Sequence, residues 1–535
     1  MQGEFIQFVY LILIILGVVM LANKLKTAYP ILLVIAGGLL SLLDGFTRIE
    51  IKPDLVFFIF LPPLLYEAAW NTSWKEFWKW RRIITSFAFP IVILTSCVVA
   101  FASHWLIPGF TLALGFLLGG IVSPPDAVSA TTILRNVKPK APRSLVSIIE
   151  GESLLNDASS LIVFRFALAA IITGQFFIGE ATASFFLVII MGIVIGLIVG
   201  GIFYCIHRFL PVTPSIEIIL TLATPYCMYY FAEHFHFSGV LAVVSGGLLL
   251  SSQSQTMLNY RSRIEAVNVW QSLVFVLNGL VFMLIGLQIP SIIAQLGDTS
   301  ILTAIWYGLA ISVILIITRL LCAYGAVVFT KIASRFIKVA DANPHWTIPL
   351  IFGWAGMRGV VSLAAAFSIP LLINDGEAFP FRSLILFITF IVILVTLVFQ
   401  GLTLPWLMKR IHVAERSTSI PEEEQEVIIQ KKMAKVSLQI LEEKYAKKCS
   451  SNSHLINLIT RLELDVKFFE TDANELLGAD KNALKDYHNI YLELLDHQRK
   501  LLDKMNHNYE FDDEVIRKYL TLIDMEEFKL REKVF

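Results

Sequence analysis

Long apolar runs recur along the chain from its start to about residue 410. Runs of roughly 18 or more apolar residues can cross the ~30 Å hydrocarbon core of a bilayer as helices. Strands of a membrane barrel would instead alternate apolar and polar residues, which these runs do not. The pattern therefore predicts an all-α polytopic membrane protein with about 13 transmembrane helices. Their limits are 4–23, 29–44, 54–70, 84–107, 111–135, 145–173, 181–206, 214–232, 237–253, 267–291, 301–330, 345–373 and 381–408.

The composition changes after residue 410. Over all 535 residues the chain is 56% hydrophobic and 16% charged, against about 25% charged in an ordinary soluble domain. From 411 to 535 it is charge-rich, and apolar residues follow at helical spacing. We expect a transmembrane domain over 1–410 and a cytoplasmic, mostly helical C-terminal tail over 411–535. The tail is either a packing appendage or a module for regulation or dimer contact.

Basic residues alternate between the predicted loops. Loops after odd-numbered spans hold nearly all of them: Lys24, Lys26, Lys75, Lys79, Arg81, Arg82, Arg135, Lys138, Lys140, Arg143, Arg208, Arg261, Arg263, Lys331, Arg335, Lys338, Lys409 and Arg410. The opposite loops hold Arg48, Lys52 and, at a span start, Arg382. Because cytoplasmic loops are enriched in Lys and Arg, we expect a cell (plasma) membrane protein with the N-terminus outside and the tail inside.

Other global features exclude some classes. The formal net charge is zero, so nothing suggests a nucleic-acid partner. The five cysteines are far apart and show no zinc-site or disulfide spacing. No small-residue cleavage site follows the first span, which we interpret as a retained helix rather than a signal peptide.

Ionisable residues inside the predicted spans are costly in lipid and mark candidate functional sites. These are Glu67 in span 3, Asp126 in span 5, Glu152 and Asp157 in span 6 and Arg358 in span 12, with Arg165 further along span 6. At 1.5 Å per residue, Asp157 lies roughly 18 Å into its span, close to the midplane. Ser153 is four residues before Asp157, so the two side chains share a helix face.

Two spans are interrupted in the middle. Gly119-Gly120 and Pro124-Pro125 precede Asp126 in span 5, and Gly356 and Gly359 flank Arg358 in span 12. Broken helices at membrane depth line cavities, and their freed carbonyls can bind cations. Spans 5 and 12 are seven apart, which fits two six-helix inverted repeats. Taken singly, each glycine would be a packing residue and each proline a kink; the two acids at one broken locus favour an ion site.

Four segments carry a resemblance to a known family: LPPLLYEAAW, SPPDAVSA, GESLLNDASS and GMRGVVSLAAA. In this order they resemble the monovalent cation:proton antiporter family, and in particular its sodium/proton exchanger branch of bacterial type, which has an Asn-Asp pair. The resemblance covers residues 1–410. It implies a homodimer in which each protomer has a dimerisation domain and a six-helix core crossed by two unwound helices.

The resemblance also implies roles for single residues. Asp157 would bind the ion and carry the proton, with Asn156 as its motif partner. Asp126 and Ser153 would be further Na⁺ ligands, and Glu67 would lie near the site. Glu152 and Arg358 would form a structural ion pair. The chain departs from the family at the unwound span, where Ser123, Pro124 and Pro125 precede Asp126.

The expected activity is secondary active antiport of Na⁺, or of Li⁺ or K⁺, against H⁺, with no cofactor beyond the transported ions. Burial favours a neutral carboxyl group and a bound cation favours the carboxylate, so the two ions would compete for Asp157 by alternating access. Asn156 carries no proton, which predicts electroneutral 1:1 exchange. The alternatives are a monovalent cation channel, an intramembrane aspartyl protease that uses Asp126 and Asp157, and a sensor or scaffold that rests on the tail.

Overall fold

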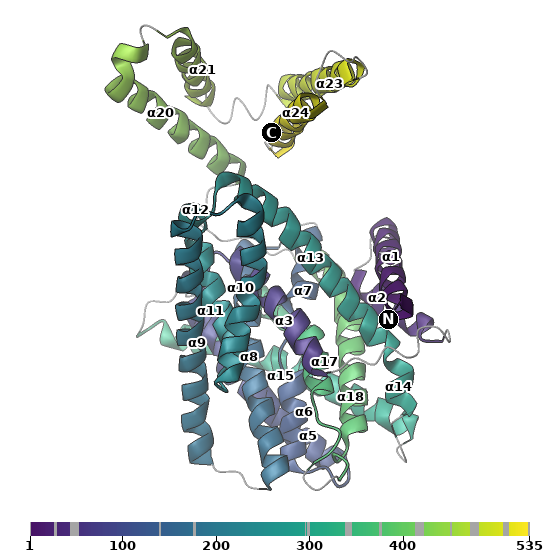
Figure 1. Cartoon of the computed structure of the whole chain (residues 1–535). Coiled ribbons are helices and arrows are strands. Elements are labelled where there is room, and N and C mark those ends of the chain that lie inside the picture. Colours follow the sequence, from purple (N-terminus) through teal and green to yellow (C-terminus); the bar gives the residue numbers. More distant parts are fainter. Residues whose placement is uncertain are drawn as a thin grey trace. The chain divides into compact units, whose positions relative to one another are not determined.

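Figure 1 shows the computed structural model of the chain. It describes residues 2–25, 29–42, 53–137, 141–174, 178–294, 296, 300–336, 345–373, 377–411, 422–449, 452–470, 481–506 and 513–532. Six loop charges of the orientation argument therefore lie outside the described residues: Lys26, Arg48, Lys52, Lys138, Lys140 and Lys338. The chain divides into two compact units, Met1–Glu415 and Arg416–Phe535.

Among the described residues of the first unit, the regular secondary structure is helical, apart from one isolated bridge between Leu372 and Ala378. Its segments are α1 (Gln2–Leu25), α2 (Tyr29–Leu40), α3 (Pro53–Asn71), α4 (Trp74–Ser86), η1 (Phe87–Ile91), α5 (Val92–Leu106), α6 (Leu112–Val122), α7 (Ala127–Asn136), α8 (Arg143–Thr173), α9 (Ile178–Phe209), α10 (Pro214–His234), α11 (Gly239–Ser252), α12 (Ser254–Met257), α13 (Tyr260–Leu287), α14 (Ile289–Ala294), α15 (Ile301–Ala333), α16 (Thr347–Trp354), α17 (Val360–Phe367), α18 (Arg382–Val395), η3 (Thr396–Gln400) and α19 (Gly401–Arg410).

Every predicted apolar range overlaps one of these helices or consecutive helical segments. Seven helices among the described residues are long and apolar enough to cross a membrane, and three shorter apolar helices accompany them. The structure thus confirms an all-helical, multi-span protein, whereas the count of 13 crossings and the inverted repeats stay predictions.

Helix packing separates most of the first unit into two groups. One group, which we call the scaffold bundle, comprises α1–α3, α9–α11 and α13: α9, α10 and α11 pack together, α11 also packs on α3, and α13 packs on α2. The other group, the site bundle, comprises α4–α8 and α15–α19: α8 packs on α4 and α6, and α15 packs on α5, α16 and α18. The bundles meet where α8 and α17 contact α3, α11 and α13.

Glycines allow the closest helix contacts. A Cβ at Gly286 of α13 would lie 2.2 Å from the Val34 carbonyl of α2, so only glycine permits this approach. Gly119 and Gly120 also serve packing, against the backbones of α5 and α8, and both lie within regular α6. The expectation that these two glycines interrupt span 5 is wrong, because the helix continues to Val122.

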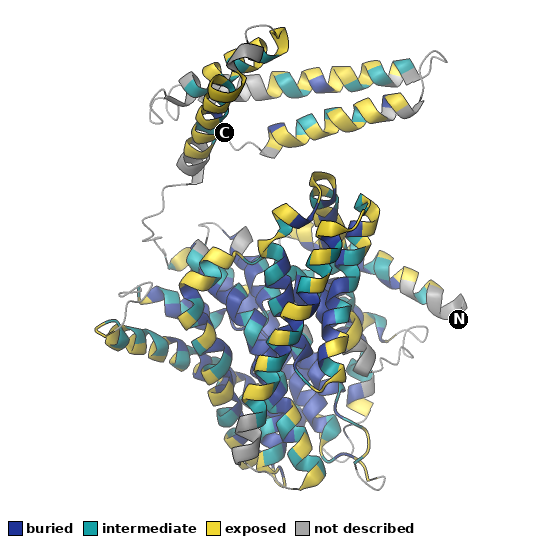
Figure 2. Cartoon of the chain, turned by 60° about the vertical axis from the view of Figure 1, so that its left-hand side comes forward, coloured by how far each residue is buried: buried dark blue, intermediate teal, exposed yellow. Residues whose placement is uncertain are grey.

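The second unit consists of four described helices: α20 (Glu422–Cys449), α21 (Ser453–Glu470), α23 (Lys481–Asn506) and α24 (Asp513–Glu532). α20 packs against α21, and α23 against α24. Arg499 of α23 forms ion pairs with Asp524, at 2.7 Å, and with Glu527 of α24. Figure 2 shows that most described residues of these helices are exposed, in contrast to the buried interior of the first unit.

Candidate functional site

Two broken helices meet in the site bundle. α6 and α7 are separated by residues 123–126, and α16 and α17 by residues 355–359. The amide of Asp126 donates a hydrogen bond to the carbonyl of Met357, at 2.7 Å, so the two breaks touch directly. Two prolines in the first break and two glycines in the second explain why neither helix continues. The predicted interruption of spans 5 and 12 is therefore confirmed at these residues.

Asp126 caps the N-terminus of α7. Its Oδ1 accepts from the amide of Val128, at 3.1 Å, and its Oδ2 accepts from the amide and hydroxyl of Ser129, at 3.3 and 2.7 Å. The carboxylate thus sits at the positive end of a helix dipole and satisfies free amides of the first turn. Gly359 lies against it, since a Cβ there would come 2.6 Å from Oδ2. The α16–α17 break therefore packs directly against the Asp126 carboxylate, and the absence of a side chain at Gly359 makes room for it.

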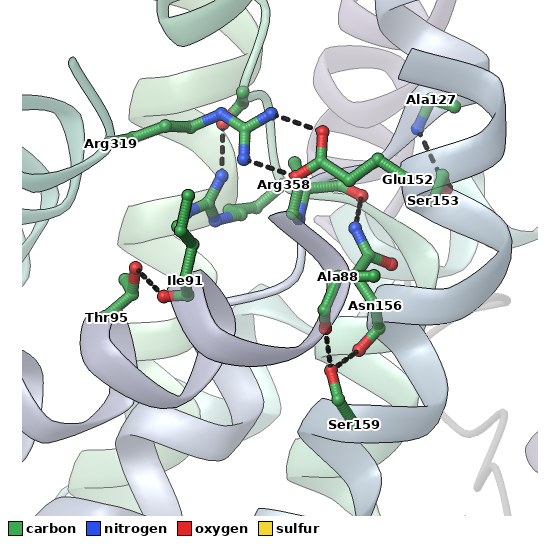
Figure 3. A network of polar contacts seen from close by, with 12 residues as sticks. Ala88, Ile91, Thr95, Ala127, Glu152, Ser153, Asn156, Ser159, Arg319 and Arg358 are labelled. Carbon is green, nitrogen blue, oxygen red and sulfur yellow. Dashed lines mark hydrogen bonds and ion pairs between the residues drawn. The ribbon is translucent and has the colours of Figure 1, made fainter. Parts of the chain in front are cut away.

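Two residues of α8 hold the first break from the other side, as Figure 3 shows. The Ser153 hydroxyl accepts from the amide of Ala127, at 3.4 Å. The Asn156 side-chain amide donates to the carbonyl of Pro125, at 3.1 Å, while its own Oδ1 is buried without a partner. Ser153 therefore lies beside Asp126, and Asn156 contacts a carbonyl that the broken helix frees.

Asp157 lies 14 residues into unbroken α8, roughly 21 Å along its axis, near the middle. It is 6% exposed. Within the described part of the chain no donor bonds to its carboxylate, and the nearby Ser160 hydroxyl bonds to its main-chain carbonyl instead. The carboxylates of Asp126 and Glu152 act on it electrostatically. Asp157 is thus a buried acid among other acids, with its oxygens uncommitted.

The predicted ion pair of Glu152 with Arg358 is wrong in its partner. Glu152 of α8 pairs with Arg319 of α15 through both oxygens, each at 2.8 Å, and the two side chains are 1% and 5% exposed. The sequence could not reveal this pairing, because it depends on which helix packs against α8. It nevertheless held a signal that we missed, since Arg319 is an ionisable residue inside a long apolar span.

Arg358 instead binds the ends of broken helices. Its Nε donates to the carbonyl of Val122 at the end of α6, at 2.6 Å, and its Nη1 donates to the carbonyl of Gly356 after α16. Its amide donates to the Thr396 hydroxyl, at 3.1 Å. The Val122 carbonyl belongs to the last turn of α6, so the guanidinium stabilises the negative end of that half-helix, and the Gly356 carbonyl belongs to the break that follows α16. Among the described residues, Arg358 therefore binds backbone carbonyls at both breaks, and Glu152 is paired with Arg319 instead.

Glu67 lies in a different setting. Its carboxylate accepts from the Asn71 side chain, at 2.6 Å, and it lines a cavity of about 190 Å³. Trp70, Trp270 and Arg263 line the same cavity, which is formed by residues of α3, α10, α12 and α13 and of the loop before α13. The residues of this cavity are not those that surround Asp157. The role of Glu67 near the ion stays a prediction.

Comparisons with known proteins identify the family of this chain. Residues 10–410 match the family described as sodium/hydrogen exchanger, transmembrane. An uncharacterized Na⁺/H⁺ exchanger of Escherichia coli is 34% identical over 454 residues, which cover 82% of this chain and 81% of that protein. The chain belongs to the sodium/hydrogen exchanger family. It is therefore a cation/proton antiporter and not an enzyme, which removes the channel and the protease from consideration.

Other members of the exchanger family extend this match. An uncharacterized Na⁺/H⁺ exchanger of Mycobacterium bovis is 29% identical over 523 residues, 97% of this chain and 94% of that protein, so its match includes most of the tail. A sodium, potassium, lithium and rubidium/H⁺ antiporter of Bacillus pumilus is 34% identical over 392 residues, 71% of this chain but 58% of that longer protein.

A solved exchanger structure shares the fold. The sodium proton antiporter MjNhaP1 from Methanocaldococcus jannaschii superimposes with a TM-score of 0.55 at 18% identity, and the match covers 76% of this chain and 97% of that one. This similarity supports the helical architecture of the first unit.

Proposed function

We propose that this antiporter exchanges one Na⁺, or another alkali cation, for one H⁺, and that both ions compete for Asp157. The observation that carries the proposal is a difference in hydrogen-bond and ion-pair partners among three buried or half-buried acids near the two helix breaks. Asp126 caps α7 and Glu152 is paired with Arg319, whereas the Asp157 carboxylate has no bonding partner among the described residues. Asp157 is the acid left to bind and release a cation.

The competition follows from the cost of a buried charge. A carboxylate without a partner is expensive away from water, and either a proton or a bound cation neutralises it. If the site bundle can switch Asp157 from one side of the membrane to the other only when Asp157 is neutralised, each cation moved one way must be matched by a proton moved the other way. One titrating acid with no second carboxyl at position 156 gives a ratio of one to one.

The surroundings of Asp157 supply oxygen ligands of the kind that hard cations take. Ser153 and Asp126 lie together at the start of α7, and the buried Asn156 Oδ1 lies one residue before Asp157. We propose Asp157, Asp126 and Ser153 as ligands, with Asn156 as the residue that orients the broken segment through Pro125. The names of relatives include sodium, potassium, lithium and rubidium, so all four cations belong in the test.

We propose a homodimer in the plasma membrane, with the N-terminus outside and residues 411–535 in the cytoplasm. The basic residues at the ends of α4, α13, α15 and α19 support this orientation.

The test is a pH-change assay in proteoliposomes. An outward or inward alkali-cation gradient should drive protons in the opposite direction, and Asp157→Asn should abolish this flux while the protein still inserts and dimerises. Coupled exchange that persists in Asp157→Asn would reject the assigned role. Absence of cation-driven proton flux in the unaltered protein, under any of the four cations, would reject the proposed cation class.

A further inference from the structure

Among the described residues, one ion pair bridges the two bundles. Nη2 of Arg165, on α8 of the site bundle, donates to both oxygens of Glu233, on α10 of the scaffold bundle, at 2.7 and 2.6 Å. The other bonds between helices described above stay within one bundle: Arg319 with Glu152 and Asn156 with Pro125 both lie in the site bundle. The Arg165–Glu233 pair is therefore placed to respond to motion between the bundles.

Glu233 is fixed at its own end. Its Oε1 also accepts from the amide of Gly239, at 3.1 Å, which is the first residue of α11. A Cβ at Gly239 would lie 3.0 Å from that oxygen and 2.6 Å from the ring of Tyr229, so the corner between α10 and α11 closes tightly around the carboxylate. Glu233 thus moves only with the scaffold bundle.

Arg165 is fixed to the ion site by its helix. It follows Asp157 by eight residues on unbroken α8, roughly 12 Å along the axis. A continuous helix of this length transmits a shift along its axis without absorbing it. Any displacement of Asp157 relative to α10 and α11 therefore stretches the bonds from Arg165 to Glu233.

We propose that Arg165 and Glu233 are positioning residues for exchange: their ion pair holds the site bundle in the conformation seen here and opens in every transport cycle. The inference rests on the proposed function, in which Asp157 is presented in turn to the two sides of the membrane. It adds the contact that sets the balance between those two conformations. Loss of the pair should destabilise the held conformation and speed the step that leaves it.

The test is a double-mutant cycle on full-length protein in proteoliposomes. Arg165→Gln and Glu233→Gln should each raise the maximal rate of Na⁺/H⁺ exchange, and the double variant should go no further than either single one. An exposed or half-exposed pair contributes up to about 1 kcal/mol, so we expect an increase of roughly twofold to fivefold. Arg165→Lys should stay near the unaltered rate, because one nitrogen makes both bonds and an ammonium can replace it.

The chain offers a matched control pair. Arg261 and Glu265 also form an ion pair at 2.7 Å, but both residues lie on α13 and so within one bundle. Arg261→Gln should leave the exchange rate and the KM for Na⁺ unchanged. Rates that are unchanged or lower in Arg165→Gln and Glu233→Gln, or effects that add in the double variant, would overturn the inference. An unaltered protein that does not exchange would instead reject the proposed function.

Discussion

At the scale of single residues, the two aspartates of the site differ in what already binds them. Asp126 accepts three hydrogen bonds from the first turn of α7, whereas Asp157 accepts none from the described residues. Asp126 therefore caps the helix after the break, whereas the Asp157 carboxylate has the free oxygens that the proposed exchange of ions requires. A substitution that separates charge from hydrogen bonding can distinguish them.

Asp126→Asn makes this separation. Asparagine keeps one acceptor oxygen and caps helices about as well as aspartate, so Tm should change little, although its NH₂ group cannot accept the bonds that Oδ2 accepts from Ser129. The negative charge that would attract the proposed cation is lost. We expect the KM for Na⁺ to rise by roughly tenfold or more, given that bonds to charged groups are worth about 1.5–3 kcal/mol. Exchange assays over a range of Na⁺ concentrations measure this. Asp126→Ala is the control that also loses the cap, and an unchanged KM in Asp126→Asn would show that Asp126 is not a ligand.

Gly359→Ala tests the contact between the two breaks. The added methyl would sit 2.6 Å from Oδ2 of Asp126 and 2.8 Å from its Cβ, so the acid or the α16–α17 break must move. Because small displacements of a reactive group are costly, we expect exchange to fall by roughly tenfold or more. Gly201→Ala is a matched control on α9, where nothing lies within 4 Å of the new Cβ. Equal activity of the two variants would contradict the fit described here.

At the scale of helices, the buried pair of Glu152 with Arg319 ties α8 to α15. Removal of one partner leaves a buried charge alone, which costs about 3–5 kcal/mol, whereas removal of both costs less. Glu152→Gln and Arg319→Met should each lower Tm strongly, and the double variant should recover part of the loss. Thermal unfolding in nanodiscs measures this. A double variant less stable than both single ones would mean that the pair is not the main role of these residues.

The helices show how far the sequence could predict this structure. Apolar length located the helices well, because lipid stabilises any sufficiently long apolar helix, and Pro124-Pro125 located the first break. The prediction that Gly119 and Gly120 interrupt span 5 is wrong, because a glycine that breaks a helix and a glycine at a helix–helix contact look the same in sequence. Residue spacing does not show which helices become neighbours. Three contacts depend on that information: Glu152 with Arg319, Arg358 with Val122, and Arg165 with Glu233.

The α23–α24 pair should be sensitive to acid. Hydrogen bonds from Arg531 and Arg499 hold the pKa of Glu527 below its ordinary value. The stabilisation is therefore present above the unfolded pKa of about 4.3 and is lost as the pH falls through the lower folded value. Hydrogen-exchange protection factors of α23 and α24 in the full chain should drop below roughly pH 4. Arg499→Gln should lower protection at neutral pH, whereas Lys500→Gln, which breaks a pair within α23, should not.

At the scale of the whole molecule, the proposed mechanism predicts how transport responds to membrane voltage. Asp126 caps α7 and Glu152 is paired with Arg319, so under this mechanism both keep their state and Asp157 alone changes its occupant. One positive charge would then replace another on the same carboxylate, and no net charge would cross the membrane.

Exchange should therefore be insensitive to voltage. With the same starting Na⁺ and pH gradients, K⁺ and valinomycin can clamp proteoliposomes at potentials from zero to about −100 mV, where each uncompensated charge would contribute about 2.3 kcal/mol. We expect the same initial rate and the same final pH gradient at every potential. A final gradient that shifts with voltage would reveal a second titrating group. Asn156→Asp supplies the positive control, because it adds a carboxyl beside Asp157 and should make the flux voltage-dependent if that carboxyl titrates during the cycle.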